Sequence, residues 1–389
     1  MKEVVIVAAV RSAVGKGKKD GGLASVHAVD LSAALMRAAI AKVNLDARTI
    51  DDVFWGCAMP EATQGLNVAR LAWLRAGLPV EVPAATINRF CSSGLQTVAL
   101  AAQEIMSGMA DVVLAGGVEM MSQVPMSGYH TRLDPDMTES YIGMGFTAER
   151  VAERWKVTRE DQDRWALGSQ HKAARALADG AFSAQIVPVP VEQVAWHGAE
   201  KQTTTAPFER DELPRPNTTI EALGKLRPAF KTNGTVTAGN ASPYSDGAAA
   251  ILLMTADRAN ELGLKPLARF ITFAAAGVEP DIMGVGPIKA VPKALKRAGL
   301  QMKDIDLVEF NEAFAAQVVA VVRDLGIPEE KVNVNGGAIA LGHPLGATGA
   351  KLTTQLIHEL GKRGGGTGLV TMCIGGGMGA AGLFEVYAA

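Results

Sequence analysis

This chain of 389 residues contains few cysteines and few aromatic residues, and it has almost no net charge. The three cysteines, at positions 57, 91 and 373, are odd in number and scattered, so they indicate a reducing compartment rather than a disulfide framework. The 38 basic and 40 acidic residues nearly cancel, which argues against a nucleic-acid or membrane surface. No apolar run is long enough to span a membrane, and the first residues lack the layout of a signal peptide. These absences predict a globular cytoplasmic protein.

Glycine, by contrast, is abundant, and glycine-rich segments surround three reactive side chains. These segments are Asn88-Arg-Phe-Cys-Ser-Ser-Gly94, Gly342-His-Pro-Leu-Gly346 and Cys373-Ile-Gly-Gly-Gly-Met-Gly379. Glycines permit tight turns and close backbone approaches, and exposed amides at such turns favour a nucleophilic thiol. Cys91, His343 and Cys373 are therefore candidate catalytic residues. No cluster of histidine, cysteine and aspartate has metal-ligand spacing, so we expect no metal site.

An internal repeat with an offset of about 255 residues relates the two ends of the chain. Three pairs of segments share this offset, the last with a small slip: 45–53 with 300–308, 91–94 with 346–349, and 111–117 with the segment that ends at 373. Each copy alternates strands and helices, which predicts mostly parallel sheets covered by helices. Two such halves packed face to face would bring Cys91 and His343 together.

The middle of the chain has no counterpart in either copy of the repeat. A helix is expected from Thr158, where Asp161 completes a capping-box-like signal, as far as Gly180. Residues 248–254 are again apolar and should rejoin the first half as a strand. The predicted units are therefore 1–118 with 246–267, an inserted lid or binding segment over 119–245, and 268–389.

Cys91 lies between a predicted strand, 84–87, and a predicted helix, 95–106. The free amides and the positive dipole end of that helix would stabilise a thiolate. The alternative is a buried, inert cysteine, which is the common fate of a free cysteine. We interpret Cys57, which follows an apolar strand, as structural.

The other candidates also have structural alternatives. His343, on a tight turn before a helix, can serve as a base or an oxyanion donor, or can simply cap that helix. Cys373 ends an apolar strand, and the glycines after it either form an oxyanion hole or only permit close strand packing. Asn311 follows the strand 307–310 and can hold a water or cap a helix. His358 is expected at a solvated helix position.

These motifs resemble those of the thiolases over essentially the full length of the chain. Further matching segments are Gly116-Gly-Val-Glu-Met-Met121, Thr237-Ala-Gly-Asn-Ala-Ser242, Asp246-Gly-Ala-Ala249, Asn311-Glu-Ala-Phe-Ala315 and Asn335-Gly-Gly-Ala338. The resemblance implies an α/β fold of two duplicated βαβαβ-type halves, with mixed sheets covered by helices in the layer order α/β/α/β/α. Related ketoacyl synthases share that fold, but are not expected to carry the second cysteine in a Cys-Ile-Gly-Gly-Gly motif.

The resemblance also implies a role for each candidate catalytic residue. Cys91 is the nucleophile that becomes acylated, and His343 activates it and donates to the thioester oxygen. Cys373 is the acid and base that moves a proton at the acetyl α-carbon or the incoming thiol of coenzyme A. Asn311 holds a water that completes one oxyanion hole, and the amides of Cys91 and Gly375 form the other.

Coenzyme A, or acetyl-CoA, is then a substrate rather than a permanently bound cofactor, and would lie along the inserted segment. Arg215 would meet its nucleotide end, Phe230 would line the adenine or pantetheine path, and Ser242 would bond the pantetheine. The alternatives are a solvated loop charge for Arg215 and core packing for Phe230.

One segment departs from the pattern of short-chain biosynthetic thiolases, which usually carry Tyr-His-Met-Gly in the lid. Here the segment is Ile142-Gly-Met-Gly145, so Gly143 replaces the histidine. With Met144 and Tyr244 also shaping the pocket, this change favours a degradative 3-ketoacyl-CoA thiolase with room for longer acyl groups.

Three functions remain to be separated: a degradative thiolase, a biosynthetic acetyl-CoA acetyltransferase, and a non-catalytic acyl-CoA-binding relative. The last would need none of the three reactive residues. The resemblance further implies a homodimer or homotetramer, with 120–141 as a candidate assembly loop, and a possible partner enzyme of β-oxidation.

Overall fold

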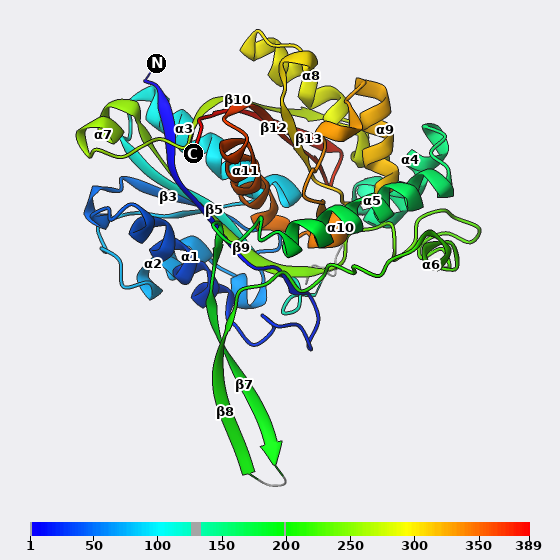
Figure 1. The fold of residues 1–389 in the computed structure, drawn as a ribbon, viewed down its shortest axis with the longest axis horizontal. Coiled ribbons are helices and arrows are strands. Elements are labelled where there is room, and N and C mark those ends of the chain that lie inside the picture. The colour runs from blue at the N-terminus through cyan, green and yellow to red at the C-terminus, as the bar shows by residue number, and fades with distance from the viewer. Residues whose placement is uncertain (1, 126–133, 198–199) are drawn as a thin grey trace.

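The computed structural model describes all residues except 1, 126–133 and 198–199, and its main feature is one large mixed sheet (Figure 1). The strand order along that sheet is β11-β12-β13-β10-β1-β9-β5-β3-β4. The strands of the first half are β1 (Val4–Ser12), β3 (Asp52–Gly56), β4 (Ala85–Ile87), β5 (Val112–Met120) and β9 (Ser245–Thr255). Those of the second half are β10 (Ala268–Gly277), β11 (Leu307–Phe310), β12 (Gly366–Ile374) and β13 (Met378–Val386). Two short strands, β2 (Gly15–Lys16) and β6 (Ile186–Val187), pair with β9 and β1.

The two halves have the same strand order, which confirms the predicted duplication. The order β3-β5-β9-β1 in the first half corresponds to β11-β12-β13-β10 in the second, and the halves meet where two residue pairs join β1 to β10. The expectation of mostly parallel sheets is wrong. Only the pairs β3–β4, β3–β5, β1–β6 and β11–β12 are parallel among the described strands. One cause is the tight turn between β12 and β13, where Gly376 and Gly377 have φ of +77° and +83°, so the chain reverses directly into the neighbouring strand.

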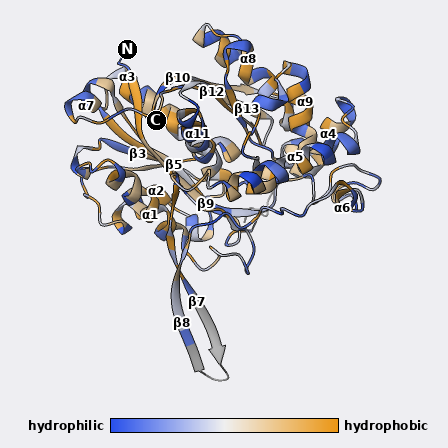
Figure 2. Ribbon diagram, in the orientation of Figure 1, coloured by the Kyte–Doolittle hydropathy of each residue, from blue (hydrophilic) through white to orange (hydrophobic). Residues whose placement is uncertain are grey.

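Helices cover both faces of each half, so the chain forms five layers (Figure 1). The central layer is α3 (Ser93–Ser107) and α11 (Leu345–Lys362), which pack on each other and on strands of both halves. The outer layers are α1 (Ala28–Lys42) with α2 (Val68–Arg75), and α8 (Gly286–Ala298) with α9 (Ala315–Leu325). Figure 2 shows apolar residues along the strands and the inner sides of these helices, where three apolar clusters form the core between the layers.

The two central helices cross closely because glycines stand at the crossing. A Cβ atom on Gly94 would lie 2.7 Å from the amide nitrogen of Ala350, and one on Gly349 would lie 2.7 Å from the Cβ of Leu95. Gly94 and Gly349 are equivalent positions of the repeat, and both lie in the first turns of their helices. The crossing therefore places the N-terminal ends of α3 and α11 side by side. His358, farther along α11, is half-buried and donates to the carbonyl of Ala9 at 3.1 Å, so the expectation of a solvated position is wrong.

The middle of the chain packs mainly on the second half. Its helices are α4 (Met144–Arg154), α5 (Arg159–Ala178) and α6 (Ile220–Gly224), and α4 and α5 contact α9. Thr158 and Asp161 form the predicted capping box of α5. The strands β7 (Val189–His197) and β8 (Glu200–Phe208) form a separate ribbon that projects from the body (Figure 1). β9 then lies between β1 and β5, which confirms the predicted return to the first half.

The division of the chain into the units 1–118 with 246–267, 119–245 and 268–389 stays a prediction. The remaining helices are short. They are α7 (Ala256–Glu261), α10 (Ala338–Leu341) and the 3-10 helices η1 (Ala47–Thr49), η2 (Ala62–Gln64), η3 (Phe90–Ser92), η4 (Pro135–Tyr141), η5 (Pro280–Val285), η6 (Met302–Asp304) and η7 (Glu329–Lys331).

Candidate active site

Cys91 lies in a tight turn between β4 and α3. The turn begins at Asn88, whose Oδ1 accepts from the amide of Phe90 at 2.8 Å and whose Nδ2 donates to the carbonyl of Ala58 at 3.1 Å. Phe90 has a φ of +43°, a conformation that is costly for a residue with a side chain. Ser93 stabilises it by accepting from the Arg89 amide and donating to the Phe90 carbonyl. The turn thus holds Cys91 at the helix start, as predicted.

The thiol of Cys91 is protonated at neutral pH. Burial raises its pKa to about 11, because a thiolate loses solvation there, and the buried charge of Glu119 acts in the same direction. The amides of Gly375 and of Cys91 itself lower the pKa, but do not outweigh burial. The amides therefore favour a thiolate as the sequence predicts, yet a base is still needed to take the proton.

His343 has the protonation state that such a base needs. It is 4% exposed, and its amide donates to Ser245 Oγ at 3.0 Å. Its Nδ1 lies 2.6 Å from Thr348 Oγ1, and that hydroxyl already donates its single hydrogen to the Pro344 carbonyl at 2.9 Å. Nδ1 must then carry the proton and donate it to Thr348, which leaves the lone pair on Nε2. Burial, with a smaller effect of Lys351, lowers the pKa of His343 to about 3, so the ring is neutral.

Asn311 contacts His343 directly. It follows β11 and is fully buried, and its Nδ2 lies 3.2 Å from His343 Nε2. Its Oδ1 is buried and has no hydrogen-bond partner among the described residues. A buried acceptor of this kind suits a water molecule, which is the role that the resemblance implies.

Cys373 is the second thiol of the site. It is fully buried near the end of β12, among apolar side chains that include Phe314 and Ala313, with Met144 packed against them. Burial raises the pKa of Cys373 well above its usual value, and the nearby Cys91 raises it further. The two thiols are therefore close enough that charge on one disfavours charge on the other. A Cβ atom on Gly375 would lie 3.5 Å from Met144 Sδ, so Met144 borders the same space.

The fold thus places Cys91 close to Cys373, Gly375 and Met144, and it places His343 against Asn311. The two sets are joined where η3, the turn of Cys91, contacts α11, the helix that follows His343. Cys57 is fully buried in an apolar cluster of the core, where its thiol lies 3.9 Å from the carbonyl of Gln64. Among the described residues, no group of three or more histidine, cysteine, aspartate or glutamate side chains could hold a metal ion. No helix in the described part of the chain is long and apolar enough to cross a membrane.

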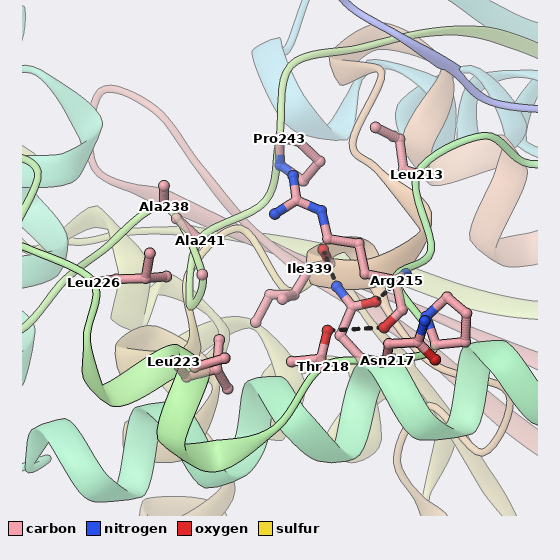
Figure 3. Close-up of a pocket in the computed structure, with 14 residues that line it drawn as sticks. Leu213, Arg215, Asn217, Thr218, Leu223, Leu226, Ala238, Ala241, Pro243 and Ile339 are labelled. Carbon is pink, nitrogen blue, oxygen red and sulfur yellow. Dashed lines mark hydrogen bonds between the residues drawn. The ribbon is translucent and has the colours of Figure 1, made fainter.

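Arg215 lies outside this group, beside a pocket of about 380 Å³ (Figure 3). Its amide donates to Gln170 Oε1 at 2.8 Å, and its guanidinium reaches toward Pro243. The pocket is also lined by Leu213, Leu223, Ala241 and Ile339. Leu213 also contacts the turn that carries His343, because a Cβ atom on Gly342 would lie 2.5 Å from its Cδ1. The pocket therefore adjoins the histidine from the outside.

The other predicted binding residues differ in exposure and in the residues that they contact. Phe230 is 38% exposed and its ring meets Phe146 and Phe314 edge-on, with centroid separations of 6.4 and 6.1 Å. Ser242 is half-buried and its amide donates to the Ala313 carbonyl at 2.9 Å. Tyr244 is 55% exposed, and its carbonyl accepts from the amide of Gly17. The roles of these residues in binding stay predictions, and the candidate assembly loop lies partly outside the described residues.

Sequence reasoning missed three polar residues of the site, Thr348, Glu119 and Glu312. Thr348 orients His343, and Glu119 is a fully buried acceptor near the end of an otherwise apolar strand. That single charge in an apolar run was the available signal. Glu312 is the residue after Asn311, and no pattern in the sequence distinguishes it from a helix-capping carboxylate.

Glu312 joins the inserted segment to the second half. Its carboxylate accepts from Trp165 Nε1 at 3.0 Å, Ser169 Oγ at 2.6 Å, Asn333 Nδ2 at 2.8 Å and the Ile339 amide at 3.2 Å. Glu312→Ala would leave these buried donors without an acceptor, so we expect the free energy of unfolding to fall by about 3 kcal/mol. Urea denaturation measures this change. The exposed Glu329→Ala is the control, with an expected change within about 0.5 kcal/mol. Equal losses in both variants would contradict the role of Glu312.

Comparisons with known proteins agree with this arrangement. The family profile "Thiolase, N-terminal domain" matches residues 4–257, and "Thiolase, C-terminal domain" matches residues 264–386. The chain belongs to the thiolase family and is an acyltransferase.

Relatives with two different names resemble it. A 3-ketoacyl-CoA thiolase of Bacillus subtilis is 55% identical over 99% of this chain and 100% of that protein. An acetyl-CoA acetyltransferase of Escherichia coli is 48% identical over 99% of both chains. Among solved structures, the acetyl-CoA acetyltransferase of Bacillus anthracis superposes with a TM-score of 0.90 at 41% identity, covering 99% of both chains. Human mitochondrial 3-ketoacyl-CoA thiolase gives 0.89 at 41% identity, covering 100% of this chain and 99% of that one.

Proposed function

We propose that this protein cleaves 3-ketoacyl-CoA with coenzyme A, through an acyl-Cys91 intermediate, into acetyl-CoA and a shortened acyl-CoA. The observation that carries the proposal is the proximity of two protonated thiols from opposite halves, the half-buried Cys91 and the fully buried Cys373. The turn of Cys91 also contacts α11, the helix that follows the neutral His343. A Claisen cleavage needs a nucleophile and a separate acid at the carbon that leaves, and two thiols supply both. A binding protein would need none of these three residues.

In the first half of the reaction, His343 Nε2 takes the proton of Cys91, and the thiolate adds to the 3-keto carbon. The oxyanion that forms accepts from the amides of Cys91 and Gly375. When it collapses, the bond between carbons 2 and 3 breaks, and the electron pair goes to the acetyl-CoA enolate. That enolate takes a proton from Cys373 while the protonated His343 and a water on Asn311 donate to its thioester oxygen.

In the second half, the Cys373 thiolate takes the proton of an incoming coenzyme A thiol. The coenzyme A thiolate adds to the acyl-Cys91 carbonyl, and Cys91 leaves as a thiolate that His343 reprotonates. All groups then return to their starting states, so the cycle is ping-pong and reversible. Coenzyme A is a substrate, and we place it along the inserted segment, with Arg215, Phe230 and Ser242 as its contacts.

We further propose a preference for 3-ketoacyl-CoA longer than acetoacetyl-CoA. Gly143 is exposed, has a φ of −64° and lies at the N-terminus of α4, one residue before Met144. It has no side chain at the position where short-chain relatives carry histidine, which leaves room for a longer acyl group. Tyr244 would shape the same pocket.

Gly143→His tests this preference, because the backbone at this position tolerates any side chain. We expect the ratio of kcat/KM for 3-ketooctanoyl-CoA to that for acetoacetyl-CoA to fall about tenfold, through lost space in the acyl pocket. Initial rates of thiolysis with the two substrates measure it. Gly168→His is the matched control, since a Cβ atom there meets nothing within 4 Å. A wild-type enzyme that cleaves only acetoacetyl-CoA would favour the biosynthetic acetyltransferase instead.

Self-association is part of the proposal. Among the described strands β4 is an edge strand that pairs on one side, and exposed apolar side chains precede it in the chain, including Leu66 at 88% and Val80 at 65% exposure. These features support a homodimer, or a tetramer of two such dimers. A partner enzyme of β-oxidation is a possible alternative occupant of the same surface. Sedimentation would detect either assembly. The need for two reduced thiols supports a cytoplasmic location.

A further inference from the structure

Glu119, near the end of β5, is buried with four donors around its carboxylate. It is 0% exposed. Oε2 accepts from the amide of Ala58 at 2.9 Å and from that of Gly346 at 2.7 Å, and Oε1 accepts from the amide of Met59 at 3.1 Å and from Gln64 Nε2. Four converging donors favour the ionised carboxylate, because an added proton would face one of them. Burial opposes them and raises the pKa of Glu119 to about 7, so the carboxylate is fully ionised above that pH.

The groups that act on Glu119 among the described residues are three backbone amides and the Gln64 side chain, and none of them is a cation. Backbone dipoles balance its charge instead, and one of them is the N-terminus of α11, where Gly346 is the second residue. The side-chain amide of Gln64 is itself fixed, since its Oε1 accepts from the Met120 amide at 2.9 Å. The carboxylate therefore occupies one defined position between the two halves.

The repeat relates this contact to the catalytic thiols. β5 and β12 correspond with an offset of 254 residues, which places Glu119 on Cys373. The sequence offset of 255 that pairs residues 91–94 with 346–349 places Cys91 on Gly346. The two contacts are therefore equivalent in the repeat. The end of β12, in the second half, brings Cys373 to Cys91, and the end of β5, in the first half, brings Glu119 to Gly346.

A continuous chain of hydrogen bonds runs from Glu119 to both catalytic turns. On one side, Glu119 holds the amide of Gly346, three residues after His343. On the other, it holds the amide of Ala58, whose carbonyl accepts from Asn88 Nδ2 at 3.1 Å. Asn88 in turn fixes the strained residue before Cys91. The turn of the histidine and the turn of the nucleophile are thus tied to the same carboxylate.

We propose that Glu119 is a positioning residue for the reaction, which holds the turn of His343 against the turn of Cys91 through its bonds to Gly346 and Ala58. This inference rests on the proposed roles of Cys91 and His343. Glu119 touches neither the thiol nor the imidazole, and acts through the backbone of both turns.

The charge of Glu119 has a second effect that a purely structural residue would lack. It raises the pKa of Cys91, after burial, so it disfavours a free thiolate. The nucleophile then forms when His343 accepts the proton, rather than standing as a thiolate in the resting enzyme. Removal of the charge should make Cys91 ionise at lower pH.

Two variants separate position from charge. Glu119→Gln keeps the size of the side chain but removes its charge. The new NH2 group would also face the amides that the carboxylate now accepts from. Glu119→Asp keeps the charge but is too short to reach both Ala58 and Gly346. Asp51→Asn is the matched control, because Asp51 also accepts from two backbone amides, those of Asp111 and Val112, at the opposite end of β5.

The experiment measures kcat for thiolysis and the pH dependence of iodoacetamide alkylation at Cys91, located by peptide mass mapping, in protein whose folding is checked by circular dichroism. We expect kcat to fall about 100-fold in both Glu119 variants with a smaller change in KM. The alkylation profile should move to lower pH by about one unit in Glu119→Gln alone. Asp51→Asn should match the wild type in both measurements.

A folded Glu119→Gln variant with wild-type kcat, or with an unshifted alkylation profile, would overturn the proposal. If that variant does not fold, Glu119→Asp decides: a wild-type kcat overturns the proposal, and a lowered kcat with a wild-type alkylation profile supports it. Alkylation needs no substrate, so its result is independent of turnover. A wild-type enzyme without thiolysis would count against the proposed function and not against the alkylation result.

Discussion

Cys91→Ala is expected to abolish turnover in both directions, by a factor of about 10⁴ or more, because no other side chain can form the acyl intermediate. Cys373 is fully buried and its pKa is raised well above the usual value, so it cannot substitute as a nucleophile at neutral pH. The measurement is loss of 3-ketoacyl-CoA with coenzyme A, together with acetoacetyl-CoA formation from acetyl-CoA.

Cys57→Ala is the control for this prediction. Cys57 is the third cysteine of the chain, is fully buried and packs in the core of the first half. Its replacement should lower thermal stability slightly and leave kcat near the wild-type value. Residual turnover in Cys91→Ala equal to that of the wild type would remove Cys91 as the nucleophile and with it the proposed mechanism.

Cys373→Ala is expected to separate the two halves of the reaction. Cys91, His343 and the Gly375 amide remain in place, so Cys91 should still be acylated slowly by an acyl-CoA. The complete cycle should slow by about 10³-fold, because no group is left to protonate the acetyl-CoA enolate. Intact-protein mass spectrometry after incubation with acetyl-CoA measures the acyl-enzyme, and the thiolysis assay measures the cycle.

Cys373→Ser tests whether the loss comes from acidity or from shape. Serine has nearly the size of cysteine, but its hydroxyl is a much weaker acid than a thiol. We expect it to behave like Cys373→Ala in the full cycle. Recovery of wild-type turnover in the serine variant would show that Cys373 fills space and does not transfer a proton.

The sequence predicted the duplicated fold because its signals are local and repeated. The helices after Cys91 and His343 begin close to where the glycine and apolar patterns place them, and the capping box of α5 is present as expected. A resemblance over the whole length then related those elements to one family. Strand direction was predicted less well, since it depends on which distant strand pairs with β9 or β13, and alternation alone does not encode that choice.

The electrostatics of the site were the least predictable part. A thiol at a helix N-terminus suggests a thiolate, but the pKa of Cys91 depends on how fully neighbouring segments remove water from it. Glu119 belongs to a motif visible in the sequence, yet its four donors come from segments more than 50 residues away in the chain. Only the folded chain shows that one carboxylate serves both turns.

Because α3 and α11 cross, the candidate active site is built from residues of both copies of the repeat, and neither copy contains the whole set. Cys91 belongs to the copy that starts the chain, whereas His343, Asn311 and Cys373 belong to the copy that ends it. A fragment that contains one copy would therefore carry either the proposed nucleophile without its proposed base or the base without the nucleophile. Mixing the two fragments should restore turnover only if their central helices, α3 and α11, pack together again.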